Sequence, residues 1–134
     1  MARPKAILYA RVSTAEQVEG YSIRQQLAAL ADWCEVQGYD VLEEVVDEGL
    51  SAAYMDRPGL DRALELVRAG GVAVVLAQDA DRITREPMHR MILDEECVKR
   101  GARLLALDDW GDDSHEGQLL RYIKNWQSKG ERLE

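Results

Sequence analysis

The 134-residue sequence predicts a three-layer α/β/α domain, built on a mostly parallel sheet of four to five strands. Two observations predict this fold class. Short apolar runs of strand length alternate along the chain with amphipathic stretches of helical length. Three of the helical stretches also end at glycine directly before an apolar run, as expected where a helix closes in the left-handed conformation and leads into a strand.

The first half of the predicted sheet consists of two strands joined by one helix. Residues 5–12 form an apolar run and are expected as the first strand. Apolar residues then recur at helical spacing from Ser22, which with Gln25 has the form of a capping box. Gly38 is placed to end this helix, and the second strand is expected over 39–46.

The second half repeats this order twice. Pro58 suits the first turn of a helix, and the two glycines at 70–71 end it. The apolar run 72–76 that follows is the clearest strand in the chain. A third helix is expected to open at 86–87 and to lead into a strand over 102–107. Such a succession of strand, helix and strand is typical of a parallel sheet with helices on both faces.

The predicted α/β domain occupies residues 1–113, and residues 114–134 are expected to be the start of a C-terminal helix. Apolar residues recur at helical spacing between 117 and 134, but this stretch ends in charged residues without a capping glycine. We therefore expect a helix that is cut short, in a chain that is a fragment of a longer protein.

Composition limits the class of protein. The net charge is −8, with 25 acidic and 17 basic residues, which by itself argues against binding to polyanionic nucleic acid. Cys34 and Cys97 fall in helical patterns without metal-ligand spacing, so we expect buried free thiols of a reducing cytoplasm. The sequence shows no signal peptide and no apolar run that could span a bilayer, so we expect a soluble intracellular protein.

Residues capable of chemistry follow the strands at their carboxyl ends. In open α/β sheets this edge binds ligands, because its loops vary freely and helix amino termini point toward it. One serine, four arginines and two carboxylates are expected there: Arg11, Ser13, Asp47, Arg57, Asp81, Arg82 and Arg85. Several guanidinium groups repel one another unless an anion lies between them, and their donors match phosphate oxygens. A serine hydroxyl beside such a phosphate is a candidate nucleophile.

Several segments resemble the resolvase/invertase family of serine recombinases in order and spacing. The two clearest are Tyr-Ala-Arg-Val-Ser-Thr at 9–14 and Asp-Arg-Ile-Thr-Arg at 81–85. Further matching segments lie at 16–17, 21–26, 47–51 and 57–60. The Tyr-Ser-Ile stretch that begins at residue 21 is most similar to the large recombinases of phage integrases and mobile elements. The resemblance covers nearly the whole chain.

The resemblance implies a mechanism of DNA cleavage and joining. Ser13 would attack a DNA phosphodiester, giving a 5′-phosphoserine link and a free 3′ hydroxyl. Strand exchange and religation would then proceed without ATP, metal or another cofactor. Asp81 would pass a proton to or from the 3′ oxygen, although a structural ion pair with an arginine is the alternative.

The resemblance also implies roles for the other matched residues. Arg11, Arg82 and Arg85 would hold the scissile phosphate, and Arg57 would help to organise the site. Asp47 is expected to orient an arginine rather than to take part in chemistry. The supporting or phosphate-binding positions are Tyr9, Gln17, Gln26, Asp47 and Arg57. The sequence departs from the family just before Asp81, where it has Gln78, Asp79 and Ala80 and relatives often carry lysine and leucine. Asp79 adds negative charge near the expected phosphate.

DNA is the partner that the resemblance implies, through downstream DNA-binding domains that this chain lacks. The full-length protein would act as a homodimer and homotetramer, encoded by a bacterium or a phage and located in the cytoplasm. Since affinity in this family comes mostly from the downstream domains, the acidic composition is acceptable. We expect the fragment to bind DNA weakly and not to recombine it alone.

Other interpretations of the same residues remain open. Aspartates near strand ends also suit a Mg²⁺-binding signalling domain or phosphatase, namely Asp47, Asp79, Asp81, Asp108 and Asp109. A catalytically silent assembly module is a third interpretation. Arg82 and Arg85, taken alone, would be a solvated helix face paired with Glu86. A Ser-His-Asp hydrolase has little support, since both histidines, His89 and His115, are expected at the surface and no nucleophile-elbow motif is present.

Overall fold

The computed structural model describes residues 3–13, 22–49 and 57–108, and the expected helix over 114–134 lies outside these ranges. The strands are β1 (Lys5–Val12), β2 (Asp40–Glu48), β3 (Val72–Ala77) and β4 (Arg103–Ala106). The helices are α2 (Ile23–Gln37), α3 (Pro58–Ala69), α4 (Ala80–Ile83) and α5 (Pro87–Lys99). Every strand and helix predicted within these ranges is confirmed, with ends that move by one or two residues. The short helix α4 was not predicted.

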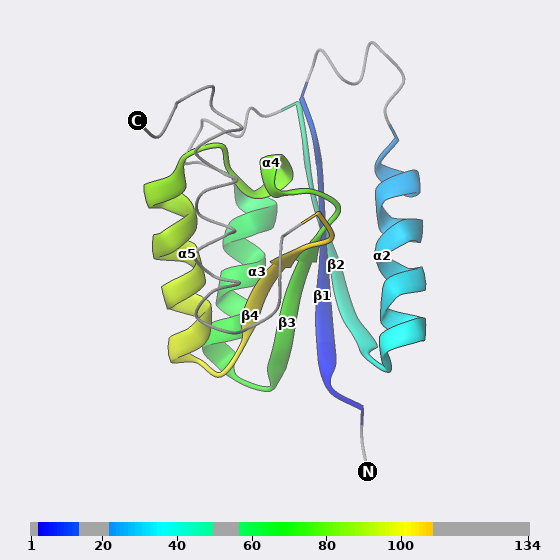
Figure 1. Cartoon of the computed structure of the whole chain (residues 1–134), viewed down its shortest axis with the longest axis vertical. Helices are drawn as coiled ribbons and strands as arrows, with labels where there is room; N and C mark the ends of the chain where they lie inside the picture. The colour runs from blue at the N-terminus through cyan, green and yellow to red at the C-terminus, as the bar shows by residue number, and fades with distance from the viewer. Residues whose placement is uncertain (1–2, 14–21, 50–56, 109–134) are drawn as a thin grey trace.

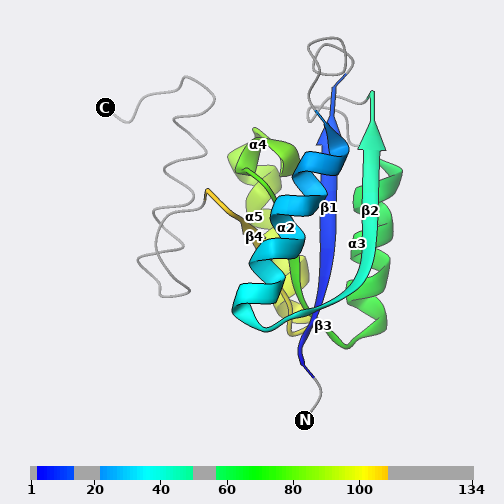
Figure 2. The same ribbon diagram turned by 90° about the vertical axis from the view of Figure 1, so that its right-hand side faces the viewer.

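The four described strands form one parallel sheet in the order β2-β1-β3-β4. Helix α2 covers one face and helices α3 and α5 cover the other, which confirms the three-layer α/β/α prediction (Figure 1). Figure 2 views the same sheet from the α2 side. The chain moves outward in opposite directions from β1 and from β3, so these two neighbouring strands flank the switch point of the sheet. The loops that follow the two strands diverge at such a point, so the carboxyl ends of β1 and β3 leave space for a ligand.

Alternation of side chains along β1 divides the core into two parts. Ile7 and Tyr9 pack in the cluster on the α3 and α5 side, whereas Ala6 and Leu8 pack against α2. By the same two-residue period, Arg11 lies on the α3 and α5 side of the sheet. Arg11 carries a charge, so this buried face of β1 changes from apolar to polar where the strand ends.

Helix α2 and the two cysteines also follow the sequence-based expectations. Ser22 caps α2, since its hydroxyl accepts a hydrogen bond from the backbone N–H of Gln25 at 3.2 Å. Gly38 closes the helix with φ of 84°, a conformation that costs glycine little. Cys34 and Cys97 are free thiols in the core. Among the described helices, none combines the length and apolar character needed to cross a membrane.

Candidate active site

The side chain of Arg11 turns from the end of β1 toward α4. Its Nε donates to the carbonyl of Arg82 at 3.1 Å, and its Nη2 donates to the carbonyl of Asp81 at 3.0 Å. Only 3% of Arg11 is exposed to solvent. The sequence-predicted meeting of the β1 arginine with the segment after β3 is therefore present, and it is made through backbone carbonyls.

Arg82 in turn donates a hydrogen bond to the backbone of Arg11. Its Nη1 donates to the carbonyl of Arg11 at 3.1 Å, and its Nε lies 3.5 Å from Oδ2 of Asp79. Arg82 is 7% exposed, so the hypothesis that it forms part of a solvated helix face is wrong. It is buried because α4 is a single turn lying across the carboxyl end of the sheet, with this side chain directed inward.

Arg57 is a third buried guanidinium at the same place. It precedes α3, and its Nη1 donates to the carbonyl of Arg82 at 3.1 Å while its Nη2 donates to the carbonyl of Ile83. Its guanidinium carbon lies 5.9 Å from the centre of the Tyr9 ring, within the range of a cation–π contact. Arg11 and Arg57 thus donate to the same carbonyl, that of Arg82, while the guanidinium of Arg82 donates to the carbonyl of Arg11.

Gln26 fixes the backbone of β1 from the α2 side. Its Oε1 accepts from the N–H of Arg11 at 3.2 Å, and its Nε2 donates to the carbonyl of Arg11 at 3.1 Å. The amide therefore satisfies both backbone groups of one residue, as a neighbouring strand would. Gln26 is 2% exposed, which makes it a support for Arg11 rather than a ligand for phosphate.

Asp47, near the end of β2, connects β1 to the start of α3 through its carboxylate. It accepts hydrogen bonds from the Tyr9 hydroxyl at 2.8 Å and from the backbone N–H groups of Gly59 at 2.7 Å and Leu60 at 3.1 Å. Within the described residues its hydrogen bonds reach no arginine. Instead this carboxylate caps α3, whose own N-cap residue, Arg57, makes no side-chain cap bond.

Two further features belong to this support, the close approach of α3 to β2 and the burial of Tyr9. A Cβ atom on Gly59 would lie 2.8 Å from the carbonyl oxygen of Val46, so only glycine lets the helix start so close to the strand. Burial raises the pKa of Tyr9 far above its ordinary value, against the opposing charge of Arg57, so the phenol stays a donor to Asp47.

Ser13 is the first residue after β1 and is partly buried. Ser13 lies two positions after Arg11, so continuing the strand period by one residue would give it the same face of the sheet as Tyr9 and Arg11. The N–H of Gly49 donates to the carbonyl of Val12 at 2.8 Å, so the residue just before Ser13 is tied to the end of β2. The hydroxyl of Ser13 is therefore carried two positions after the buried Arg11.

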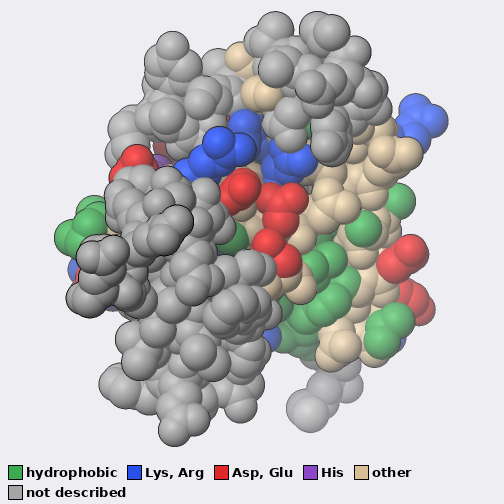
Figure 3. All heavy atoms as spheres, turned by 45° about the horizontal axis from the view of Figure 1, so that its top comes forward, with side chains coloured by type: hydrophobic (Ala, Val, Ile, Leu, Met, Phe, Trp, Pro, Cys, Tyr) green, Lys and Arg blue, Asp and Glu red, His purple; other side chains and the backbone are tan. Residues whose placement is uncertain are grey.

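Arg85 and Asp81 lie at the surface of this group. The Arg85 side chain is 66% exposed, and its Nε lies 3.8 Å from Oδ2 of Asp81. Arg85 is thus not part of the buried set of arginines, and it pairs with Asp81 rather than with Glu86. Figure 3 brings this end of the sheet forward and shows basic side chains directly beside acidic ones. Gln17 lies outside the described residues.

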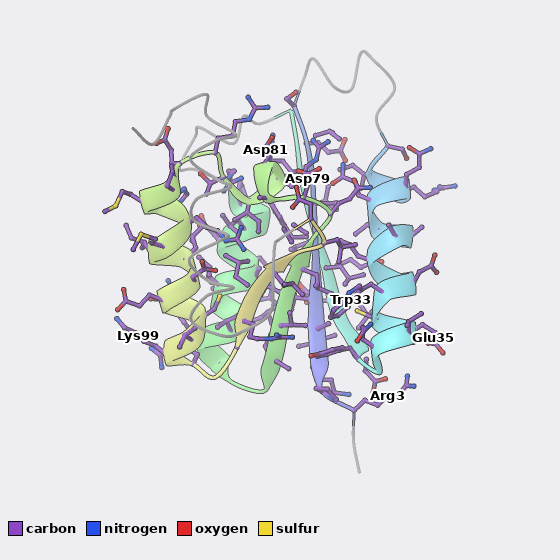
Figure 4. All side chains as sticks on the ribbon, in the orientation of Figure 1. Arg3, Trp33, Glu35, Asp79, Asp81 and Lys99 are labelled. Carbon is purple, nitrogen blue, oxygen red and sulfur yellow. The ribbon has the colours of Figure 1, made fainter. Side chains whose placement is uncertain are left out.

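Two aspartates to which the recombinase resemblance gave no role accept hydrogen bonds from the backbone of α4. Asp79 accepts from the backbone N–H of Arg82 at 3.1 Å, and Asp108 accepts from that of Ala80 at 2.9 Å. Asp79 directly precedes α4 and Asp81 lies in it, at the carboxyl end of the sheet (Figure 4). Burial raises the pKa of the Asp79 carboxyl, while Arg82 acts to lower it. A sequence signal existed, since aspartate is a favoured N-cap residue and Asp79 follows directly after the apolar run of β3 and Gln78.

His89 is also closer to the site than expected. The ring is half-buried, and its Nδ1 lies 3.1 Å from Oγ1 of the buried Thr84. Burial, and then the charge of Arg57, lower the pKa of the imidazole. His115 lies outside the described residues.

The described part of the chain contains no group of three or more histidine, cysteine or acidic residues that could hold a metal ion. The aspartates of the Mg²⁺ interpretation are instead engaged as helix caps or ion pairs. Asp47 caps α3, Asp79 and Asp108 cap α4, and Asp81 pairs with Arg85. Asp109 lies outside the described residues. The site is therefore organised around cations, and the group it suits is an anion.

Comparison with known proteins gives a consistent result. The family model "Resolvase, N terminal domain" matches residues 6–133. A Bacillus subtilis (strain 168) protein named "Putative DNA recombinase" is 35% identical over 126 residues, which are 93% of this chain and 25% of that relative. This chain thus spans a quarter of the length of that relative.

Solved structures agree with this match. The N-terminal catalytic domain of TP901-1 integrase has a TM-score of 0.77 and 27% identity, covering 93% of this chain and 97% of that one. A resolvase family site-specific recombinase from Streptococcus pneumoniae has a TM-score of 0.72 and 26% identity, covering 94% and 89% of the two chains. The chain therefore belongs to the resolvase N-terminal domain family, the catalytic domains of serine recombinases.

Proposed function

We propose that this domain cleaves and rejoins DNA with Ser13 as the nucleophile. The observation that carries the proposal is the mutual anchoring of Arg11 and Arg82, which assembles a buried cationic group two residues from Ser13. Arg57 adds a third guanidinium, which donates to the same Arg82 carbonyl as Arg11. A phosphodiester gains charge on its equatorial oxygens during in-line displacement, and guanidinium groups fixed in advance stabilise that charge.

In the proposed step, the Oγ–P bond of Ser13 forms while the bond between phosphorus and the 3′ oxygen breaks. The serine proton leaves as the nucleophile attacks, and the 3′ oxygen takes up a proton as it departs. The DNA 5′ end remains on Ser13 as a phosphodiester. Attack by a 3′ hydroxyl on this phosphoserine reverses the step, so joining needs no ATP because one ester replaces another. We assign no metal or cofactor to it.

Asp81 is the proposed group for proton transfer at the 3′ oxygen. Its Oδ1 is buried and has no hydrogen-bond partner among the described residues, while its Oδ2 faces Arg85. An oxygen with this freedom can accept a proton from, or return one to, a nearby reacting group. Arg85 lies at the rim and would close on the phosphate when DNA is present.

The proposed partners follow from the family. DNA is the substrate, bound chiefly through parts of a longer protein, and cleavage takes place in a homodimer or homotetramer in the bacterial cytoplasm. The acidic composition of this chain, with net charge −8, supports weak DNA binding by the catalytic domain alone.

A nicked suicide substrate tests the proposed function. The natural full-length protein containing this domain is incubated with duplex DNA that carries its recombination site, so that the cleaved strand diffuses away and leaves a stable adduct. Mass spectrometry of the adduct is expected to place the DNA 5′ phosphate on Ser13. Ser13→Ala should abolish the adduct, and Arg11→Ala or Arg82→Ala should reduce it strongly in protein that remains folded.

The result also separates the proposal from its alternatives. An adduct on another residue would contradict the proposed nucleophile. Undiminished recombination by Ser13→Ala would favour the catalytically silent assembly module. Dependence of cleavage on Mg²⁺ would favour the metal-dependent interpretation, for which tight Mg²⁺ binding with a thermal shift is the direct measurement.

A further inference from the structure

Asp79 is the carboxylate beside the buried guanidinium of Arg82. One of its oxygens accepts the backbone N–H of Arg82 at 3.1 Å, and the other lies 3.5 Å from Nε of the same residue. The side chain of Asp79 is 33% exposed, whereas that of Arg82 is 8% exposed. The negative partner is thus the one that meets the solvent, from which an anion would approach.

The position of Asp79 reduces the electrostatic repulsion among the buried arginines when no DNA is bound. Arg11 and Arg57 both donate to the carbonyl of Arg82, whose own guanidinium donates to the carbonyl of Arg11, so three positive charges gather at this end of the sheet. Like charges gathered in a buried place destabilise one another unless a negative charge is present. Backbone carbonyls contribute only partial charges. Asp79 contributes a full negative charge and is held in place by the cap of α4.

We propose that Asp79 is a built-in counter-ion of Arg82, which offsets part of the positive charge of the site in the absence of DNA and lowers its affinity for the phosphate that replaces it. This inference rests on the proposed function, since it concerns the affinity of the same anion site.

The charged groups that face Asp79 come from two places. Arg82 and Asp81 belong to α4, and Asp108 follows β4. Burial raises the pKa of Asp79, Arg82 lowers it, and the two neighbouring carboxylates raise it. Asp79 therefore takes up a proton at a higher pH than an ordinary aspartate. As pH falls, the counter-ion loses its charge and the anion site becomes stronger.

Sulfate is the probe for this inference, because it stays a dianion through the range in which Asp79 titrates. Sulfate is titrated into the 134-residue chain, and binding is followed through the ¹⁵N NMR signals of the arginine Nε–H groups. Asp79→Asn keeps an acceptor for the helix cap and removes only the charge. At neutral pH we expect it to bind sulfate about three- to tenfold more tightly than the wild type.

The pH dependence gives a second readout. Wild-type affinity for sulfate should rise as pH falls and approach that of Asp79→Asn, whose affinity should change much less. Without sulfate, Asp79→Asn should unfold at a lower denaturant concentration than the wild type. Tighter anion binding together with lower stability is the signature of a lost counter-ion. If the asparagine variant does not fold, Asp79→Ser supplies a neutral cap for the same measurements.

Two further variants make the outcomes distinct. Asp108→Asn removes one charge from the other cap of α4 and should change affinity less than twofold; an increase equal to that of Asp79→Asn would overturn the inference. Arg82→Gln should abolish binding in both backgrounds. Sulfate binding that depends on Arg82 but is equal in wild type and Asp79→Asn would also overturn the inference and leave the proposed function standing. Binding that survives Arg82→Gln, or is absent from every variant, would contradict the anion site itself.

Discussion

Arg11 and Arg82 each donate from the side chain to the backbone carbonyl of the other, across 71 positions of the sequence. This exchange ties the end of β1 to α4 at the switch point of the sheet. A carbonyl carries no net charge, so these two hydrogen bonds leave the positive charge of the pair uncompensated, apart from the part that Asp79 offsets at Arg82. The same contacts thus stabilise the fold and prepare the site.

Replacing Arg82 by lysine should destabilise the domain. A lysine ammonium lacks the planar fork that reaches the Arg11 carbonyl while Nε faces Asp79, so buried polar groups would lose a partner at a cost of about 1–3 kcal/mol. Urea denaturation measures the change. Arg85→Lys is the matched control, since its exposed side chain should contribute less than about 0.5 kcal/mol. Equal effects of the two substitutions would contradict the assigned anchoring role.

The Tyr9–Asp47 hydrogen bond should be coupled to the cap of α3. Tyr9→Phe should cost about 1.5–3 kcal/mol, because it removes a buried bond to a charged group. Asp47→Ala should cost more, because the N–H groups of Gly59 and Leu60 also lose their acceptor. A double-mutant cycle should show that Tyr9→Phe costs less once Asp47 is absent.

The control for this cycle is Tyr39→Phe. Its hydroxyl accepts from Arg103 Nη2 at 3.3 Å in a less buried setting, so its loss should cost less than about 1.5 kcal/mol. Strictly additive effects of Tyr9→Phe and Asp47→Ala would show that the two residues do not act as one support.

His89 should make stability depend on pH. Burial and Arg57 lower its pKa in the folded state, whereas the unfolded chain binds the proton near the ordinary value of about 6.5. Between these two values the unfolded state holds more protons, so stability rises with pH and falls as pH drops below about 6.5. His89→Asn retains an atom facing Thr84 and cannot titrate.

Denaturant unfolding at several pH values measures this effect, and NMR titration of the ring measures the pKa directly. The wild type should lose stability relative to His89→Asn as pH falls through this range. Parallel stability curves for the two proteins, or a ring pKa at or above the ordinary value, would contradict the assigned environment of His89.

The sequence was sufficient to predict the sheet and its flanking helices, because apolar periodicity and capping glycines are local signals. It was not sufficient for α4, which is one turn long and leaves no periodic pattern. Asp47 was expected to orient an arginine, but its cap of α3 depends on the close approach at Gly59, which only the packed fold shows. The roles of Asp79 and His89 likewise arise from neighbours distant in sequence.

A crystal structure of the domain with bound sulfate tests the central claim most directly. The claim predicts one sulfate in contact with the guanidinium groups of Arg11 and Arg82, with the Ser13 hydroxyl directed at the sulfur from the opposite side. A Ser13 side chain on the α2 face of the sheet, with the sulfate and the arginines on the other, would contradict it.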